Sequence, residues 1–257
     1  MRLSGGNLRP ALKAVWLGRV SYDDGLALQK KLVEKISQAK VTRQPIDNVL
    51  LLLEHSPVFT VGIRERLYTA EEERLRATGA DFCRTNRGGL ITFHGPGQLV
   101  AYPIVDLASL TVAPTAEFPT RRVGVRRFVH LVEETLIDLL KTKHGFLTAG
   151  RSPDTGVWLD EGDRKIAAIG LSIRRGISSH GLALNCNTDL KWFDEASGAY
   201  GASCDRSLFR SSPVGSKGRA SRRYRRNSPK TSPLKRISFR SARFSGGISR
   251  LMSTQLS

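Results

Sequence analysis

The chain has 257 residues, of which 40% are hydrophobic and 25% are charged, so it is long enough to bury one large core or two small ones. This composition excludes a chain that is disordered throughout and a fibrous protein. The formal charge of +18 is typical of nucleic-acid-binding proteins, but residues 204–257 carry 14 Lys and Arg against one acid, Asp205. The rest of the chain is therefore only mildly basic.

The cysteines Cys83, Cys186 and Cys204 are too widely spaced for a Cys-x-x-Cys metal site, and their odd number does not suit a secreted disulfide framework. A reducing compartment, no metal site and no cofactor are expected. No apolar run approaches the roughly 18–20 residues that span a bilayer, so no membrane association is expected. Four basic residues precede the first acid, Asp23, which permits a mitochondrial address. We predict a mitochondrial location, with the cytoplasm as the alternative.

The first half of the chain predicts a strand at 14–20 that leads into a helix. Ser21-x-x-Asp24 is typical of a helix start, and Leu28, Leu32 and Ile36 recur every four residues after it. The continuous apolar run 48–54 predicts a central strand that is covered on both faces. A further helix is expected to start near Thr69, and further strands at 58–61, 81–85, 90–93 and 99–105.

The second half predicts a loop at 108–119 and then a long amphipathic helix that ends at Gly145. Strands are expected around 157–158, 166–173 and 182–184. Because strands and helices do not alternate strictly, the order indicates an α+β fold with a mixed β-sheet flanked by helices. The residues predicted to form the buried face of the long helix are Val125, Phe128, Val132, Leu136 and Leu139.

Residues 201–257 differ in character from residues 1–200. Beyond Ser203 the chain has 13 serines, several arginine runs and no sustained apolar periodicity. Such a segment cannot bury enough apolar surface to offset the entropy lost on ordering. We therefore predict one catalytic domain over 1–200 and a disordered Ser/Arg-rich tail over 201–257. An arginine-rich tail with scattered aromatic residues can bind RNA, so nucleic-acid binding is an alternative function, but a tail without a nucleic-acid partner is the preferred interpretation.

The most informative stretch is Arg87-Gly-Gly-Leu-Ile-Thr-Phe-His-Gly-Pro-Gly-Gln98, in which four glycines surround a strand-like segment. Such glycines let a backbone approach a ligand closely, although a pair of tight hairpin turns would use the same residues. Gly95-Pro-Gly97 lacks the third glycine of a dinucleotide fingerprint. The segment 145–152 has Arg151 where a phosphate-binding loop needs Lys. Neither NAD nor ATP is indicated.

This stretch strongly resembles the signature of the octanoyl-(acyl carrier protein):protein N-octanoyltransferases, also called lipoyl(octanoyl) transferases. The resemblance covers about residues 12–193 and implies the α/β sandwich fold of biotin and lipoate ligases. The other motifs that carry it, in family order and spacing, are Ser56-Pro-Val-Phe-Thr60, Thr155-Gly-Val-Trp158, Arg164-Lys-Ile-Ala-Ala-Ile-Gly170 and Ser179-His-Gly-Leu-Ala-Leu-Asn185.

The resemblance implies a two-step acyl transfer, the first step of protein lipoylation. A cysteine takes octanoate from octanoyl-acyl carrier protein, and a lysine of a lipoyl domain then attacks the enzyme-bound thioester. The lipoyl domains are those of 2-oxoacid dehydrogenases and of the glycine-cleavage subunit, and the enzyme is expected to act as a monomer. A neighbouring lysine lowers the pKa of the cysteine in the family, and Lys165 falls on its position.

The family's acyl-binding segments fall on three stretches of this chain, where small residues would make room for an eight-carbon chain. His94 and, outside these segments, His180 are also compatible with ordinary core histidines. The residues carried over as acyl-binding are Arg87, Gly88, Gly89, Leu90, Ile91, Thr92, Phe93, His94, Ala168, Ile169, Gly170, Gly181, Leu182 and Ala183.

The match fails where the family has its nucleophile. The family continues after Trp-Phe with His-Ile-Val-Pro-Cys-Gly, whereas Ala199 stands at that cysteine's position here. The abrupt break indicates a frameshift, a retained intron or an alternative terminus. We therefore predict a poor or inactive transferase unless Cys204 serves as the catalytic cysteine beside Lys165.

An ATP-dependent lipoate or biotin ligase is the same-fold alternative. It is disfavoured because His94 is followed by Gly-Pro-Gly-Gln, whereas lipoate ligases typically have Asp after this histidine. The Arg/Gly-rich adenylate loop of biotin ligases is also missing.

Overall fold

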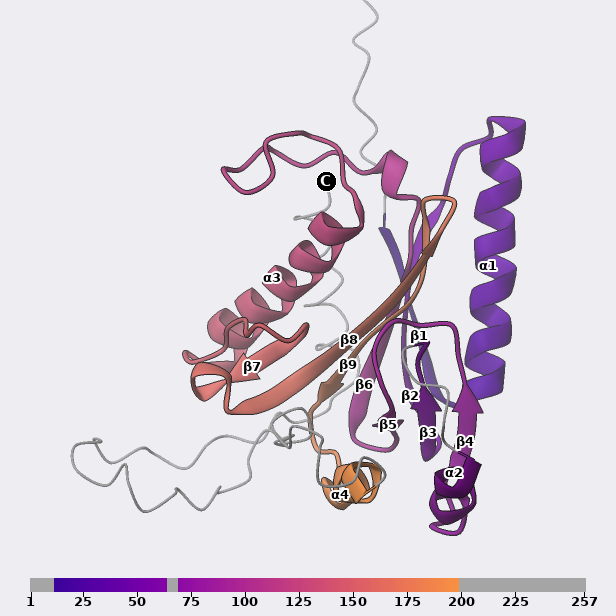
Figure 1. Ribbon diagram of the computed structural model, residues 1–257. Helices are drawn as coiled ribbons and strands as arrows, with labels where there is room; N and C mark the ends of the chain where they lie inside the picture. Colours follow the sequence, from indigo (N-terminus) through magenta and orange to yellow (C-terminus); the bar gives the residue numbers. More distant parts are fainter. Residues whose placement is uncertain (1–11, 64–68, 199–257) are drawn as a thin grey trace, which may run out of the picture.

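The computed structural model describes residues 12–63 and 69–198, and the predicted tail with Cys204 lies outside them (Figure 1). Among the described residues, no helix is both long enough and apolar enough to cross a membrane. The elements in chain order are β1 Leu12–Val20, α1 Tyr22–Thr42, β2 Asn48–His55, β3 Val58–Val61, α2 Thr69–Arg76, β4 Asp81–Arg84, β5 Thr92–His94, β6 Gln98–Ile104, α3 Val125–His144, β7 Val157–Leu159, β8 Arg164–Arg174, β9 Ile177–Asn185 and α4 Lys191–Gly198, with short 3-10 turns at Leu107–Ser109 and Asp160–Gly162.

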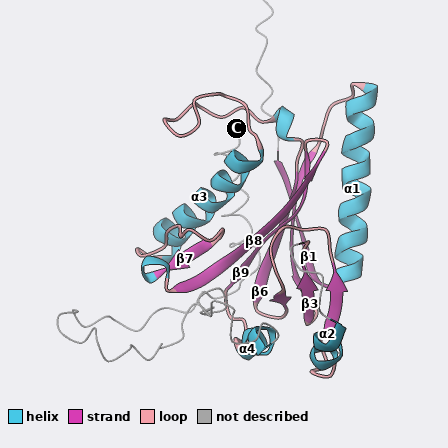
Figure 2. Ribbon diagram, in the orientation of Figure 1, coloured by secondary structure: helices cyan, strands magenta, loops and turns pink. Residues whose placement is uncertain are grey.

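Six strands form the main sheet in the order β1-β2-β6-β9-β8-β7. Only β1 and β2 pair in parallel, and the other neighbours are antiparallel, which confirms the predicted mixed sheet. Helices α1 and α3 lie on opposite sides of it (Figures 1 and 2). The side chains of β2 alternate between these layers, since Leu50 and Leu52 share a core with α3 whereas Leu51 and Leu53 share one with α1. This confirms a central strand that is covered on both faces.

The two long helices begin and end where their capping residues predict. The Ser21 side chain accepts a hydrogen bond of 3.1 Å from the backbone N–H of Asp24 and so caps α1. Helix α3 ends at Gly145, which has a left-handed φ of 72°. Val125 departs from the predicted buried face of α3, because it lies in the first turn and is 54% exposed.

A second sheet in the order β4-β3-β5 packs its apolar side chains against α2 and α4. Its core contains the fully buried Phe59 and Phe93, which pack against Trp192 and Phe193 of α4. One expectation needs correction here, and one helix is not predicted by the sequence. The strand expected at 90–93 begins only at Thr92, because the Gly-rich turn extends further, and α4 was not predicted because its few apolar residues give too short a pattern.

Candidate active site

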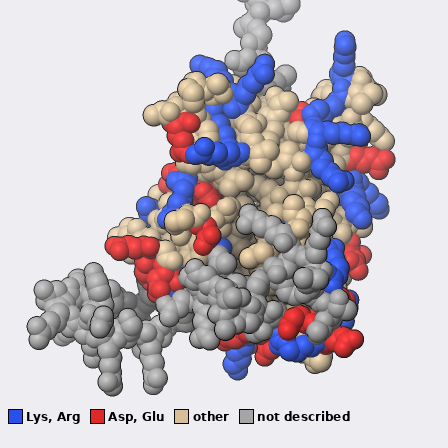
Figure 3. Space-filling view, viewed as in Figure 1, with Lys and Arg blue, Asp and Glu red and all other residues tan. Residues whose placement is uncertain are grey.

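One cavity of about 380 Å³ lies between β8, β9, the first turns of α3 and the loop before β5. This volume is within the range of small-molecule sites. Thirteen of the fourteen residues expected to bind the acyl chain line it, all except Phe93, together with Lys165. Segments that are far apart in sequence therefore meet in one place. Figure 3 shows an uncharged, hollowed surface on this side of the molecule, between Lys and Arg groups over α1 and near the start of α3.

Phe93 faces away from the cavity because successive residues of a strand point to opposite faces. Thr92 and His94 line the cavity, whereas the ring of Phe93 stacks on Trp192 with centroids 4.8 Å apart. Phe93 thus supports the cavity from behind and is not part of its lining.

Two of the predicted glycines are needed for close backbone packing. Gly170 and Gly181 are directly paired across β8 and β9. A Cβ atom at Gly181 would lie 2.0 Å from the carbonyl oxygen of Ala101, and one at Gly170 would lie 2.9 Å from that of Gly88. These glycines, which also line the cavity, therefore allow β6 and the 87–91 loop to approach β9 and β8 closely.

Arg87 fixes the cavity-lining loop to the second sheet. Its side chain is buried, and its guanidinium donates to the carbonyl oxygen and hydroxyl of Thr60, at 2.6 and 2.9 Å from Nη2, and to the carbonyl oxygen of Gly88 at 2.9 Å. The backbone N–H of Gly88 in turn donates to the carbonyl oxygen of Leu171 on β8 at 3.2 Å. The Arg87 side chain thus joins the loop to β3, and the loop backbone joins it to β8.

His94 is held neutral and in one tautomer. Burial, together with the nearby charge of Arg87, lowers its pKa to about 3. The amide nitrogen of Gln98 donates to Phe93 O and to Asn185 Oδ1. The Gln98 oxygen therefore faces His94 Nδ1 at 2.7 Å and accepts a hydrogen bond from its N–H. This leaves His94 Nε2 as the nitrogen with a lone pair.

Two further histidines near the cavity are also neutral. Burial lowers the pKa of His55 and that of His180 to about 4. His55 donates from Nδ1 to Val20 O, so its Nε2 accepts from the Tyr102 hydroxyl at 2.7 Å. His180 lies 2.8 Å from Asn86 Oδ1, which accepts from its Nε2. His94 and His180 are therefore buried and hydrogen-bonded, as ordinary core histidines are, and both also line the cavity.

Lys165 lies where β8 begins, directly opposite Trp158 of β7. Its Nζ is 4.5 Å from the centroid of the Trp158 ring, a cation–π contact. Burial lowers the pKa of this ammonium group, and the negative charges of Asp154 and Glu133 partly oppose the effect. Lys165 is therefore not the solvated surface charge that an isolated lysine usually is.

The family described as the lipoyl protein ligase A/B catalytic domain matches residues 21–206. The chain belongs to this family. The octanoyl-(acyl-carrier-protein):protein N-octanoyltransferase LIPT2, mitochondrial, of Danio rerio is 52% identical over 72% of this chain and 75% of its own length. The corresponding Homo sapiens protein is 43% identical over 72% and 77%, and an octanoyltransferase of Desulforamulus reducens 39% over 69% and 71%. Within the family, the chain is therefore an octanoyltransferase.

Solved ligase structures share the fold. A bipartite lipoate protein ligase of Thermoplasma acidophilum has a TM-score of 0.59 at 14% identity, covering 96% of this chain and 84% of that one. Lipoate-protein ligase A bound with ATP has a TM-score of 0.57 at 15% identity, covering 96% and 85%. This confirms the predicted lipoate-ligase-like fold.

The resemblance implies a catalytic cysteine, and neither described cysteine suits that role. Cys83 and Cys186 do not line the cavity, and burial raises the pKa of both thiols, that of Cys186 to about 12. Ala199 and Cys204 lie outside the described residues. Sequence reasoning missed Tyr22, Tyr102 and Asn185 in the cavity wall, of which only Asn185 lies in a quoted motif.

Proposed function

We propose that this chain transfers octanoyl from octanoyl-acyl carrier protein to a lysine of a lipoyl domain, with Lys165 as the proton carrier and Cys204 as the acyl acceptor. The observation that carries the proposal is the meeting of three acyl-binding segments and Lys165 in one cavity. The aliphatic side chains that line the cavity, among them Leu90, Ile169 and Leu182, can contact an eight-carbon chain.

In the first step Lys165 takes the proton of the Cys204 thiol. The sulfur attacks the thioester carbonyl, a new C–S bond forms, and the bond to the phosphopantetheine sulfur breaks. The departing thiolate takes the proton back from Lys165. A lysine that is desolvated gives up its proton near neutral pH more easily than an exposed one, so the burial of Lys165 supports this role.

In the second step the lysine amine of the lipoyl domain attacks the enzyme thioester. A C–N bond forms, the C–S bond to Cys204 breaks, and Lys165 passes the amine proton to the released thiolate. The partners are octanoyl-acyl carrier protein and the lipoyl domains of 2-oxoacid dehydrogenases and of the glycine-cleavage subunit. The reaction takes place in mitochondria. This location is supported by the Danio rerio and Homo sapiens relatives, whose names describe them as mitochondrial.

Intact-mass analysis after incubation with octanoyl-acyl carrier protein tests the proposal. The expected result is an octanoyl adduct on the wild type that is lost in Cys204→Ser. No adduct on the wild type would contradict the proposal and show that Ala199 leaves the chain without a nucleophile. Transfer that requires ATP and free lipoate would support the ligase alternative instead.

A further inference from the structure

Residues 150–158 form a loop that passes beside Lys165. Gly150 and Trp158 exchange backbone hydrogen bonds of 2.9 Å in both directions and so close the loop. Inside it, Gly156 has a φ of +136°, and a Cβ atom there would lie 2.6 Å from the carbonyl oxygen of Ala167 and 3.3 Å from Lys165 Cε. The loop backbone is therefore packed directly against the lysine stem.

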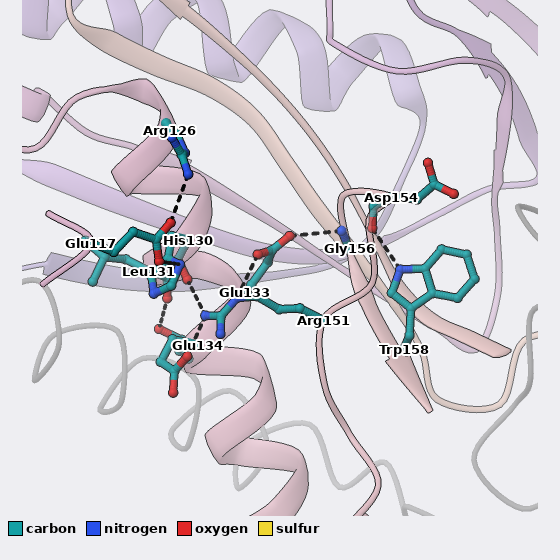
Figure 4. Close-up of polar contacts among 11 residues, drawn as sticks. Glu117, Arg126, His130, Leu131, Glu133, Glu134, Arg151, Asp154, Gly156 and Trp158 are labelled. Atoms are coloured by element: carbon teal, nitrogen blue, oxygen red, sulfur yellow. Dashed lines mark hydrogen bonds and ion pairs between the residues drawn. The ribbon is translucent and has the colours of Figure 1, made fainter. Parts of the chain in front are cut away.

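Glu133 of α3 is the side chain that anchors this loop. It is buried, and its Oε1 accepts a hydrogen bond of 3.1 Å from the backbone N–H of Gly156. Its Oε2 accepts one of 3.0 Å from Arg151 Nε. Figure 4 shows the Glu133 carboxylate between these two partners, with the Trp158 indole directed toward Asp154. Trp158 Nε1 donates to Asp154 O at 2.9 Å.

We propose that Glu133 is a positioning residue for Lys165, because its two carboxylate oxygens tie the 150–158 loop to α3 and so hold Trp158 against the lysine side chain. A carboxylate with both oxygens bound is fixed in direction, and a buried one is costly to release from its partners. The charged groups that face the lysine from other elements are Glu133 and Asp154, and Arg151 faces Glu133.

The adjacent residue provides a matched control. Glu134 also binds Arg151, but its side chain is 44% exposed, against 11% for Glu133, and Gly156 donates to Glu133. Replacing either carboxylate by Gln removes one charge and one ion pair with Arg151. Only the change at 133 alters the hydrogen bond to the backbone N–H of Gly156, the loop residue that packs against Lys165.

The test observes the position of Lys165 directly. Full-length protein carrying ¹³C at lysine Cε gives one Lys165 signal, assigned by its loss in Lys165→Arg. Because protons over an aromatic ring are shielded, this signal should lie upfield of the other lysines. In Glu133→Gln the chemical shift of this signal should move toward the value of the solvent-exposed lysines. In Glu134→Gln the chemical shift should be the same as in the wild type. Octanoyl transfer by the same samples should fall only for Glu133→Gln.

A folded Glu133→Gln protein with an unshifted Lys165 signal would overturn the proposal, as would a wild-type signal among the exposed lysines. If Glu133→Gln melts at a much lower temperature, Arg151→Gln replaces it, because this change removes the partner of Oε2 from a partly exposed position. A partial return of the signal is then expected, and an unchanged signal would refute the inference. The inference rests on the proposed role of Lys165, but the signal needs no turnover, so failure of the proposed transfer reaction is seen separately.

Discussion

Two places along β8 differ in how they hold the cavity together. The 87–91 loop meets β8 at Gly170 and Leu171, where neutral histidines, amides and one buried guanidinium form the supporting hydrogen bonds. Five residues away, a strand length of about 16 Å, Lys165 lies among the carboxylates Asp154 and Glu133. The first place suits binding of an uncharged chain and the second suits proton transfer, so substitutions at the two places should affect different measurements.

Lys165→Met should have the largest effect. Removing the proton carrier should lower octanoyl transfer by roughly 10²–10⁴-fold and leave the fold nearly unchanged. The rate of transfer from octanoyl-acyl carrier protein measures this. Lys143→Met, an exposed change at the end of α3, is the control and should keep the wild-type rate. An unchanged rate in Lys165→Met would remove this lysine from the mechanism.

Gly181→Ala should act on the fold instead of the chemistry. The added methyl would lie 2.0 Å from Ala101 O and 2.8 Å from Pro103 Cδ, so strands β6 and β9 must separate. We expect a loss of about 3 kcal/mol in the free energy of unfolding. Urea denaturation measures it, with Gly124→Ala as the control, since no atom lies within 4 Å of a Cβ there. Equal stability of the two variants would contradict the close packing of β6 on β9.

Low pH should reduce the stability of the protein through the buried histidines near the cavity. The folded pKa values of His94, His55 and His180 are about 3, 4 and 4, against an ordinary 6.5. Below pH 6.5 the unfolded chain binds more protons than the folded one, so these three residues lower the stability as the pH drops, His55 and His180 until about pH 4 and His94 until about pH 3. His94→Gln should reduce this loss by about 3 kcal/mol between pH 7 and pH 4. Urea denaturation across this range tests it, and an unchanged pH slope in the variant would refute it.

Long elements with a sustained apolar pattern or a clear capping residue could be predicted from the sequence. Ser21 and Gly145 mark the ends of long helices, and the uninterrupted apolar run of β2 identifies a central strand. The three-residue β5 and the eight-residue α4 are stabilised by packing around Phe93, which local patterns do not report.

Some residues of the candidate site could also be predicted from the sequence, whereas others reach it only through tertiary packing. Lys165 and the three segments that line the cavity could be located through motifs, because each motif is contiguous in the sequence. Glu133 belongs to none of those motifs and reaches the 150–158 loop only through the packing of α3. Phe93 was assigned to the wrong side because a motif does not specify which way each residue of a strand faces.

Val125→Ala should have the smallest effect and should separate binding from stability within one helix. Val125 lines the cavity and is 54% exposed, whereas Val132, two turns along α3, is fully buried. Removing two exposed methyl groups should change the free energy of unfolding by less than about 0.5 kcal/mol. If octanoate covers this side chain, losing about one buried methylene equivalent of contact, roughly 0.8 kcal/mol, should weaken binding about fourfold. Calorimetric titration with octanoate measures the affinity.

Val132→Ala should show the reverse, a stability loss of about 2 kcal/mol with unchanged affinity, because its methyl groups contact only the core. Equal effects of the two variants on octanoate binding would show that the acyl chain does not reach the first turn of α3.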